Sequence, residues 1–234
     1  VGCKRTGIYI DAIRKAKGLI ADRPVLAGVI GPFSLAGRLL DVTEAMVLCY
    51  DEPEIVHIVL DKCTKFIIKY IDAYKKAGAD GIVLAEPLGG LLSPSLADEF
   101  SSAYVKKIVN QSQSDNFAII YHNCGDNVIQ MIDGILDTGS AAYHFGNSID
   151  MSVMLSKVPK NTVVMGNVDP AGQIKNGSAE SVRNETLRIM EKCSSYDNFI
   201  ISSGCDIPPM APWENINAFF DAVKQYNIKK SKRV

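Results

Sequence analysis

The sequence has few of the features that would mark a membrane protein or a nucleic-acid-binding protein. No apolar run reaches the roughly 18 residues that a membrane-spanning helix needs, and we expect no signal peptide. Apart from the tail Lys229–Arg233 there is no basic block, and the formal net charge is −1. We therefore expect neither a membrane nor a nucleic acid as a partner.

Histidine and regularly spaced cysteine are scarce as well. The chain has three histidines, at positions 57, 122 and 144, and six cysteines without regular spacing. In a chain of this size such cysteines are expected to be reduced thiols, which favours a cytoplasmic protein. Four cysteines are interpreted as structural, because three lie in helical patterns and one lies near the N-terminus: Cys49, Cys63, Cys193 and Cys3.

The composition is that of a globular protein. Apolar residues make up 47% of the chain and charged residues 22%, which is normal for a folded core. The length of 234 residues fits one large domain covering residues 1–234. The first residue is Val rather than Met, so we expect the natural start to lie upstream.

Strand-like and helix-like segments alternate, which indicates a parallel sheet covered by helices. The predicted strands are Val25–Ile30, Gly81–Ala85, Phe117–Tyr121, Ala141–Phe145, Thr162–Gly166 and Phe199–Ser202. The predicted helices are Ile8–Ile20, Ser34–Leu40, Thr43–Tyr50, Pro53–Ala77, Ser95–Asn110, Asn127–Asp137, Met151–Lys157, Ala179–Cys193 and Trp213–Tyr226. Six such units are two short of a (β/α)8 TIM barrel, so we expect an α/β barrel whose first part precedes Val1. An open, six-stranded, doubly wound sheet is the alternative.

Turn and cap residues support this pattern. Asp41 and Glu54 belong to acidic groups at helix starts, where the helix dipole favours negative charge. Gly78 and Gly139 each precede a predicted strand and are expected to end helices. Gly31-Pro32-Phe33 is interpreted as a tight strand-to-helix turn, because it lacks the glycine spacing and the Lys of a phosphate-binding loop.

The motif His122-Asn123-Cys124, with Cys205 81 positions after Cys124, is the most informative feature of the chain. Residues i and i+2 of an extended segment point the same way, so His122 and Cys124 can bind one ion. Imidazole and thiolate are ligands that zinc prefers, and three protein ligands leave a fourth position open, as in catalytic zinc sites. The alternative is a buried histidine beside two inert core thiols.

Further polar residues follow the ends of predicted strands, where the active sites of barrels and doubly wound sheets lie. Glu86 is expected to assist at the metal or to orient one of its ligands, with a solvated loop carboxylate as the alternative. Asn167 and Asp169 are candidates for binding substrate or corrinoid, but Asp169-Pro170 also suits a helix start. His144 lies within a predicted strand and is interpreted as a hydrogen-bonded structural histidine rather than a ligand.

Several segments resemble a known family in order and spacing. Ala27–Ala36, Ala77–Gly81 and Gly166–Pro170 resemble landmarks of the uroporphyrinogen decarboxylase superfamily. Tyr121–Gly125 and Ser203–Pro208 resemble one branch of it, the methylcobamide:coenzyme M methyltransferases. The resemblance spans essentially the whole chain from Ile8 onward.

The resemblance implies a zinc site formed by His122, Cys124 and Cys205, at which a thiol accepts a methyl group from a corrinoid. It also implies a barrel of which the first part, about two strands, is absent here. Many relatives carry an acid where this chain has Gly146-Asn147, so the resemblance assigns no fourth ligand. The corrinoid-anchoring pattern Asp-x-His-x-x-Gly does not occur in the chain, and we expect the corrinoid on a separate protein or as a free molecule.

The expected activity is therefore zinc-dependent methyl transfer from a methylated corrinoid protein to a thiol such as coenzyme M. A tetrapyrrole decarboxylase is the alternative enzyme, although true decarboxylases lack the three ligands. A corrinoid-binding or regulatory subunit with a structural zinc is the alternative without catalysis, although the sequence offers no obvious fourth cysteine for such a site.

Overall fold

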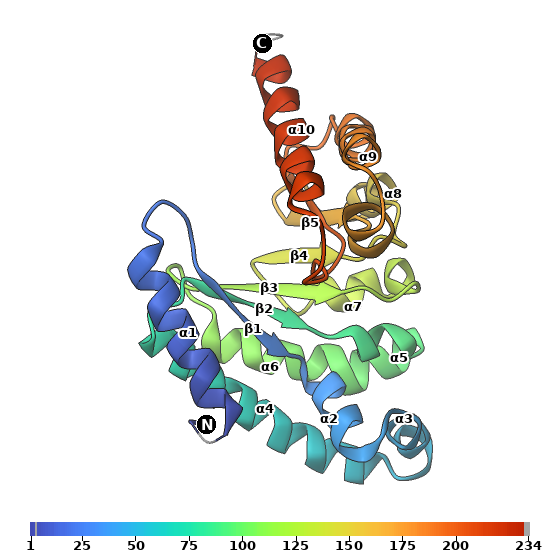
Figure 1. The fold of residues 1–234 in the computed structure, drawn as a ribbon. Helices are drawn as coiled ribbons and strands as arrows, with labels where there is room; N and C mark the ends of the chain where they lie inside the picture. The colour runs from blue at the N-terminus through green and yellow to red at the C-terminus, as the bar shows by residue number, and fades with distance from the viewer. Residues whose placement is uncertain (3, 232–234) are drawn as a thin grey trace. The chain divides into compact units, whose positions relative to one another are not determined.

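The computed structural model describes residues 1–2 and 4–231 (Figure 1). Cys3, one of the four cysteines expected to be structural, lies outside the described residues, as does the end of the basic tail at 232–234. Six strands follow one another in sequence order within one sheet. The pairs β1–β2, β2–β3 and β5–β6 are parallel. The predicted α/β class with a parallel sheet is confirmed.

The chain divides into two compact units, Val1–Ala142 and Tyr143–Val234. The first unit contains α1 (Arg5–Leu19), β1 (Leu26–Ile30), α2 (Pro32–Leu40), α3 (Val42–Asp51), α4 (Pro53–Lys76), β2 (Gly81–Ala85), the 3-10 turn Pro87–Leu91, α5 (Pro94–Ala97), the π-helical turn Asp98–Ser102, α6 (Ala103–Ser112), β3 (Ala118–Asn123), the 3-10 turn Val128–Met131 and α7 (Ile132–Leu136). The second unit contains α8 (Met151–Lys157), β5 (Val163–Val168), the π-helical turn Pro170–Lys175, α9 (Ala179–Lys192), β6 (Phe199–Ser203) and α10 (Trp213–Ser231). Strand β4 (Ala142–Phe145) begins at the boundary.

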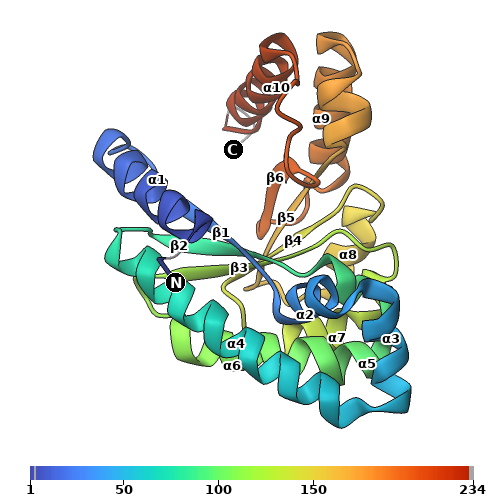
Figure 2. The same cartoon turned by 60° about the horizontal axis from the view of Figure 1, so that its bottom comes forward.

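The core of the first unit lies between its sheet and the long helix α4. Apolar residues recur along α4 at helical spacing, and Val56, Leu60, Ile67 and Ile71 are buried. This spacing places them on one face of the helix. Helices α4 and α6 lie together on one side of β1, β2 and β3 (Figure 2). Strand β3 is buried from Ile119 to Asn123, so its end belongs to the core.

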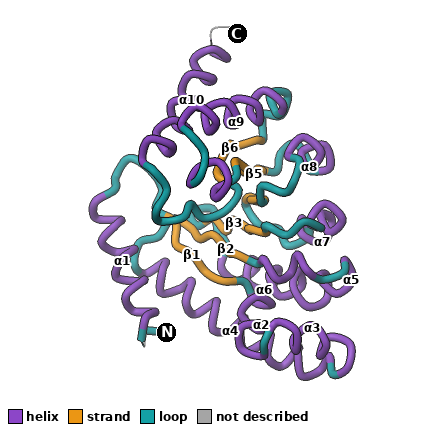
Figure 3. The backbone as a smooth tube through the Cα atoms, turned by 45° about the vertical axis from the view of Figure 1, so that its right-hand side comes forward, coloured by secondary structure: helices purple, strands orange, loops and turns teal. Residues whose placement is uncertain are grey.

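The core of the second unit is smaller. Val164 and Val168 of β5 are fully buried, as are Val182 of α9 and Ala222 of α10. Helices α9 and α10 run side by side (Figure 3). Strand β6 pairs with β5 but contains no buried residue.

Each strand has the predicted location to within two residues at either end. Strands β3 and β5 are longer than predicted, so His122 and Asn167 are the penultimate residues of their strands rather than loop residues. The predicted helix Ser95–Asn110 is interrupted by the π-helical turn, and Asn127–Asp137 is part 3-10 helix. Gly78 and Gly139 have φ of +94° and +72°, which confirms the predicted helix ends because glycine adopts this conformation without strain.

Among the described residues, none of the helices combines the length and the apolar character that crossing a lipid bilayer requires.

Candidate metal centre

His122 is built into the interior of the first unit. It is buried and pairs in register with Ala85 of β2. Its backbone carbonyl accepts a hydrogen bond of 2.8 Å from the backbone N–H of Glu86. The strand pair therefore determines the position of the His122 backbone.

Cys124 follows β3 directly and is held by its neighbours. The amide of the buried Asn123 donates to the Tyr121 hydroxyl at 3.0 Å and accepts from the Gly125 backbone N–H at 2.9 Å. A side chain on Gly125 would come within 2.8 Å of the Gly90 Cα atom, so only glycine fits there. The residues on both sides of Cys124 are thus fixed in place. Asn123 does this through its two hydrogen bonds, a role that the sequence did not reveal.

Cys205 belongs to the second unit and lies two residues beyond the end of β6. The Gly204 backbone N–H donates to the Val168 carbonyl at 2.7 Å, which continues the pairing with β5. A Cβ atom on Gly204 would lie 2.6 Å from the Asn147 backbone nitrogen. The close approach of two backbones requires glycine directly before the thiol.

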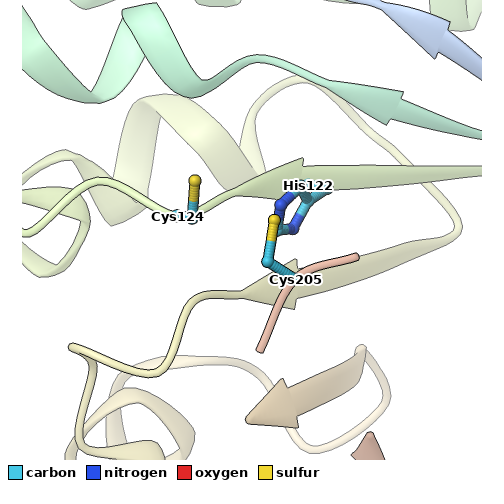
Figure 4. A group of neighbouring side chains, drawn as sticks. All are labelled: His122, Cys124 and Cys205. Atoms are coloured by element: carbon cyan, nitrogen blue, oxygen red, sulfur yellow. The ribbon is translucent and has the colours of Figure 1, made fainter. Parts of the chain in front are cut away.

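One ligand atom from each of His122, Cys124 and Cys205 lies within 4.8 Å of the others (Figure 4). Among the described residues, this is the group of three His, Cys, Asp or Glu side chains that could hold a metal ion. One imidazole nitrogen and two sulfurs suit zinc. The hard cations magnesium and calcium favour oxygen ligands, which this group lacks.

Glu86 is not a solvated loop carboxylate, so that alternative is wrong. Its side chain is fully buried and contacts the start of α2. The carboxylate accepts hydrogen bonds from the backbone N–H groups of Phe33 and Ser34 at 2.9 and 2.6 Å, and from the Ser34 hydroxyl. A Cβ atom on Gly31 would lie 2.5 Å from this carboxylate. The predicted turn at Gly31-Pro32-Phe33 is confirmed. The carboxylate of Glu86, the residue that follows β2, packs against this turn and accepts the Phe33 N–H.

The environment of Glu86 also changes its acidity. Burial raises the pKa of the Glu86 carboxyl to about 7, because desolvation disfavours the charged form. The three hydrogen bonds from α2 oppose this effect but do not cancel it. The positive end of the α2 dipole also favours the charged form.

Asn167 and Asp169 both hold backbone in place. The Asn167 amide donates to the carbonyls of Gly146 and Ile149 at 2.8 and 2.6 Å, which anchors the loop after β4. Asp169 accepts from the backbone N–H groups of Ala171 and Gly172, each at 2.9 Å, so the interpretation as a helix-start cap is confirmed. Substrate binding by these residues stays a prediction.

His144 of β4 has the hydrogen-bonded role expected of a structural histidine. Its Nε2 atom lies 2.7 Å from the Ser203 carbonyl and 3.0 Å from the Ser202 hydroxyl. It therefore ties β4 to the end of β6, two residues before Cys205.

The structural interpretation of three other cysteines is confirmed. Cys49, Cys63 and Cys193 are buried and free. Burial raises the pKa of each thiol to about 11, so they stay protonated and unreactive at neutral pH.

A comparison with protein families identifies the fold as that of a known family. The sequence model described as uroporphyrinogen decarboxylase (URO-D) matches residues 2–226, nearly the whole chain. The chain belongs to the uroporphyrinogen decarboxylase family. The predicted fold class, an α/β fold of the barrel type found in this family, is confirmed.

Relatives in this family carry two different names. The chain is 29% identical over 235 residues to a uroporphyrinogen decarboxylase of Coxiella burnetii, covering 96% of this chain and 64% of that protein. It is 27% identical over 227 residues to a methylcobamide:CoM methyltransferase of Methanosarcina acetivorans, covering 95% and 64%. The chain thus spans 64% of the length of these relatives.

A solved structure has a closely similar fold. It is described as a methyltransferase from Methanosarcina mazei, with a TM-score of 0.85 and 23% sequence identity over 95% of this chain and 65% of that one. At this level of identity the likeness concerns the fold alone.

Proposed function

We propose that this chain contains the metal-binding part of a zinc-dependent methyltransferase, which moves a methyl group from a methylated corrinoid protein to a thiol such as coenzyme M. The observation that carries the proposal is the donor set of His122, Cys124 and Cys205. A decarboxylation has no need of one imidazole and two thiols, whereas activation of a thiol does. The relative named as a methylcobamide:CoM methyltransferase supports this proposal.

The proposed chemistry concerns the ionisation of the acceptor thiol. A free thiol has a pKa near 8.5 and is mostly protonated at neutral pH, although the thiolate is the nucleophile. When bound, zinc would hold the substrate sulfur in its thiolate form. The neutral imidazole of His122 and the thiolates of Cys124 and Cys205 would carry two negative charges, which balance the charge of the ion.

Methyl transfer then requires one bond to form and one to break. The substrate thiolate attacks the methyl carbon, and the carbon–cobalt bond breaks with its electron pair remaining on cobalt. The thiol proton has already left to solvent. This step needs no general acid, because Co(I) is itself the leaving group.

Glu86, Asn167 and Asp169, which the sequence analysis expects to act at the metal or on the substrate, are better suited to positioning. Glu86 caps α2 with its side chain and anchors His122 with its backbone N–H. The Asn167 amide anchors the loop after β4, and Asp169 caps the turn that follows β5. We propose that they hold the strand ends in place rather than touch the reacting atoms.

A separate corrinoid carrier and a cytoplasmic location belong to the same proposal. The chain lacks an Asp-x-His-x-x-Gly motif, which supports the delivery of the corrinoid by another protein. The buried Cys49, Cys63 and Cys193 are free thiols, as expected in a reducing compartment.

A second candidate is the decarboxylation of a tetrapyrrole, favoured by relatives named uroporphyrinogen decarboxylase. Such a reaction needs cations that face the substrate carboxylates. A cleft of about 430 Å³ in the second unit has Arg188 and Lys192 in its lining. Both cations are paired, with Glu185 at 2.7 Å and with Asp150 at 2.5 Å. This cleft therefore offers weak support for carboxylate binding.

The test combines metal content, X-ray absorption and activity. We expect about one zinc per chain, with two sulfur neighbours at roughly 2.3 Å and a third after a thiol is added. Mixed with a methylated corrinoid and coenzyme M, the protein should convert methyl-Co(III) to Co(I) at a zinc-dependent rate. Tetrahydrofolate, which has no sulfur, serves as the competing acceptor. Release of carbon dioxide from a carboxylated tetrapyrrole, without methyl transfer to a thiol, would favour the second candidate.

A further inference from the structure

Strand β6 leads to the candidate ligand Cys205, and apolar packing contributes little to holding it. The strand contains no buried residue, and Cys205 itself is half-buried. A strand of this kind gains less stabilisation from the hydrophobic effect than a core strand does. Hydrogen bonds are therefore the main interactions that keep the residues before Cys205 in place.

The peptide group between Ser203 and Gly204 is hydrogen-bonded through both of its polar atoms. Its N–H donates to the Val168 carbonyl of β5 at 2.7 Å. Its carbonyl accepts from the Ser202 hydroxyl at 2.9 Å and lies 2.7 Å from Nε2 of His144. Because a peptide group is planar, bonds to both atoms define its orientation.

His144 is the donor in its contact with Ser203. A backbone carbonyl can only accept, so Nε2 of His144 carries a proton. The Ser202 oxygen lies 3.0 Å from the same nitrogen, and the Ser202 hydroxyl donates its own proton to the Ser203 carbonyl. Nε2 of His144 is thus committed to hydrogen bonds with the end of β6 and is not a metal ligand.

The contact made by His144 joins two strands that do not pair with each other. Strands β4 and β6 lie on either side of β5 in the sheet, and strands two apart in a flat sheet are separated by roughly 9.5 Å. The His144 side chain therefore reaches past β5 to the residues before Cys205. The loop after β4 meets the same residues, because a Cβ atom on Gly204 would lie 2.6 Å from the Asn147 backbone nitrogen.

We propose that His144 is a positioning residue of the metal centre, an inference that rests on the metal site of the proposed function. His144 would set the location of the Cys205 sulfur through the Ser203–Gly204 peptide group. Between this group and the Cys205 side chain, only backbone rotations at Gly204 and Cys205 intervene. Gly204 has little space in which to change its rotations, because it lies against Asn147.

The metal site makes the location of this sulfur matter. It is one of three ligand atoms that lie within 4.8 Å of one another (Figure 4). Groups that orient a ligand without binding the ion themselves typically change metal affinity by about 10- to 100-fold. Loss of the His144 contact should therefore weaken metal binding even though all three ligands remain.

Binding of Co²⁺, used as the probe in place of zinc, tests the proposal in the full chain. His144→Ala should lower the Co²⁺ affinity about tenfold, because the Ser203 carbonyl loses a donor. His144→Gln should stay within about threefold of the wild type, because the Gln amide nitrogen can donate from the place of Nε2. The side chain of His144→Asn is shorter, and this variant should resemble His144→Ala. A residue that only fills space would not separate Gln from Asn in this way.

His57→Ala is the matched control. His57 is also half-buried, with Nδ1 2.8 Å from the Tyr104 hydroxyl and Nε2 3.2 Å from a Glu99 carboxylate oxygen. It belongs to the first unit and is not a member of the candidate ligand group. Its replacement removes a comparable set of hydrogen bonds, and the Co²⁺ affinity should equal that of the wild type.

The reactivity of the Cys205 thiol provides a measurement that does not depend on metal. In the metal-free protein, alkylation by iodoacetamide is followed at each cysteine by peptide mass spectrometry. His144→Ala should raise the rate at Cys205 roughly threefold, because local opening of the released residues exposes the sulfur more often. The rate at Cys124 should stay unchanged.

Wild-type Co²⁺ affinity together with wild-type Cys205 alkylation in His144→Ala would overturn the proposal. Equal losses of affinity in His144→Gln and His144→Asn would also overturn it, since they would identify His144 as a packing residue only. Urea denaturation checks that each variant is folded, and if His144→Ala is not, the comparison of Gln with Asn decides. Absence of Co²⁺ binding by the wild type would count against the proposed function, and the alkylation rates would then decide this inference alone.

Discussion

The two strands that lead to the candidate ligands differ sharply in their surroundings. Strand β3 in the first unit is buried from Ile119 to Asn123, and His122 lies within this buried stretch. Strand β6 in the second unit contains no buried residue. Cys205 follows this strand, and the exposed apolar residues Ile207, Met210 and Trp213 come after it in the sequence. His122 is thus part of a core, whereas Cys124 and Cys205 are both half-buried. Changes near the two strands should therefore have different effects on folding and on metal binding.

The largest expected effect is the loss of metal from Cys205→Ala. We expect metal affinity to fall at least tenfold, because one of three protein ligands is lost, while the free energy of unfolding without metal changes little. The control is Cys193→Ala, which removes a buried thiol that is not one of the three proposed ligands. It should keep its metal and lose roughly 1 kcal/mol of stability. Metal analysis and urea denaturation of both variants measure this, and equal metal content in Cys205→Ala and wild type would refute the ligand assignment.

Among the substitutions considered in the first unit, Glu86→Ala should lower the free energy of unfolding most. The substitution leaves the N–H groups of Phe33 and Ser34 without their acceptor and opens a cavity beside Gly31. We expect the free energy of unfolding to fall by about 2 to 4 kcal/mol. Glu54→Ala, in the exposed first turn of α4, is the control and should cost under about 1 kcal/mol. Similar losses in the two variants would show that the Glu86 carboxylate does not hold α2.

The same carboxylate should make stability depend on pH in the metal-free protein. The pKa of Glu86 is raised to about 7 from 4.5, so the folded state binds a proton more tightly than the unfolded state. The contribution to stability is therefore greatest below pH 4.5 and is lost as pH rises to about 7. A shift of this size corresponds to roughly 3 kcal/mol. Denaturation curves between pH 5 and 8 should show this slope in the wild type and lack it in Glu86→Gln.

The second unit has a buried polar contact at Asn215, whose loss should have a smaller effect on the free energy of unfolding. Asn215→Ala removes two hydrogen bonds to backbone carbonyls and should lower the free energy of unfolding by about 1 to 2 kcal/mol. Asn227→Ala lies on the exposed face of the same helix and should have almost no effect. Thermal denaturation compares the two. A loss of stability in Asn215→Ala larger than that in Glu86→Ala would contradict the expected order, in which the buried contact of the first unit matters more.

Local signals account for the parts of the fold that were predicted well. The left-handed conformation of Gly78 and Gly139 and the cap at Asp169 depend on residues close in sequence, and each was expected. The strands were also located well, because apolar runs between turn residues are local patterns. The π-helical turn Asp98–Ser102 and the 3-10 turn Val128–Met131 were missed, since nothing in their local sequence distinguishes them from an α-helix.

What the sequence by itself determined is the set of donors and the alternating order of strands and helices, because residue types and periodicities are properties of the chain. It also placed His122, Cys124 and Cys205 near the ends of strands. Only the tertiary structure decided that Glu86 is a fully buried cap for α2 and that Asn123 fixes the residues around Cys124. It also decided that Trp213 remains exposed although it lies two residues before the buried Asn215. Burial and hydrogen bonding between residues distant in sequence arise only when the chain has folded, and so no local pattern announces them.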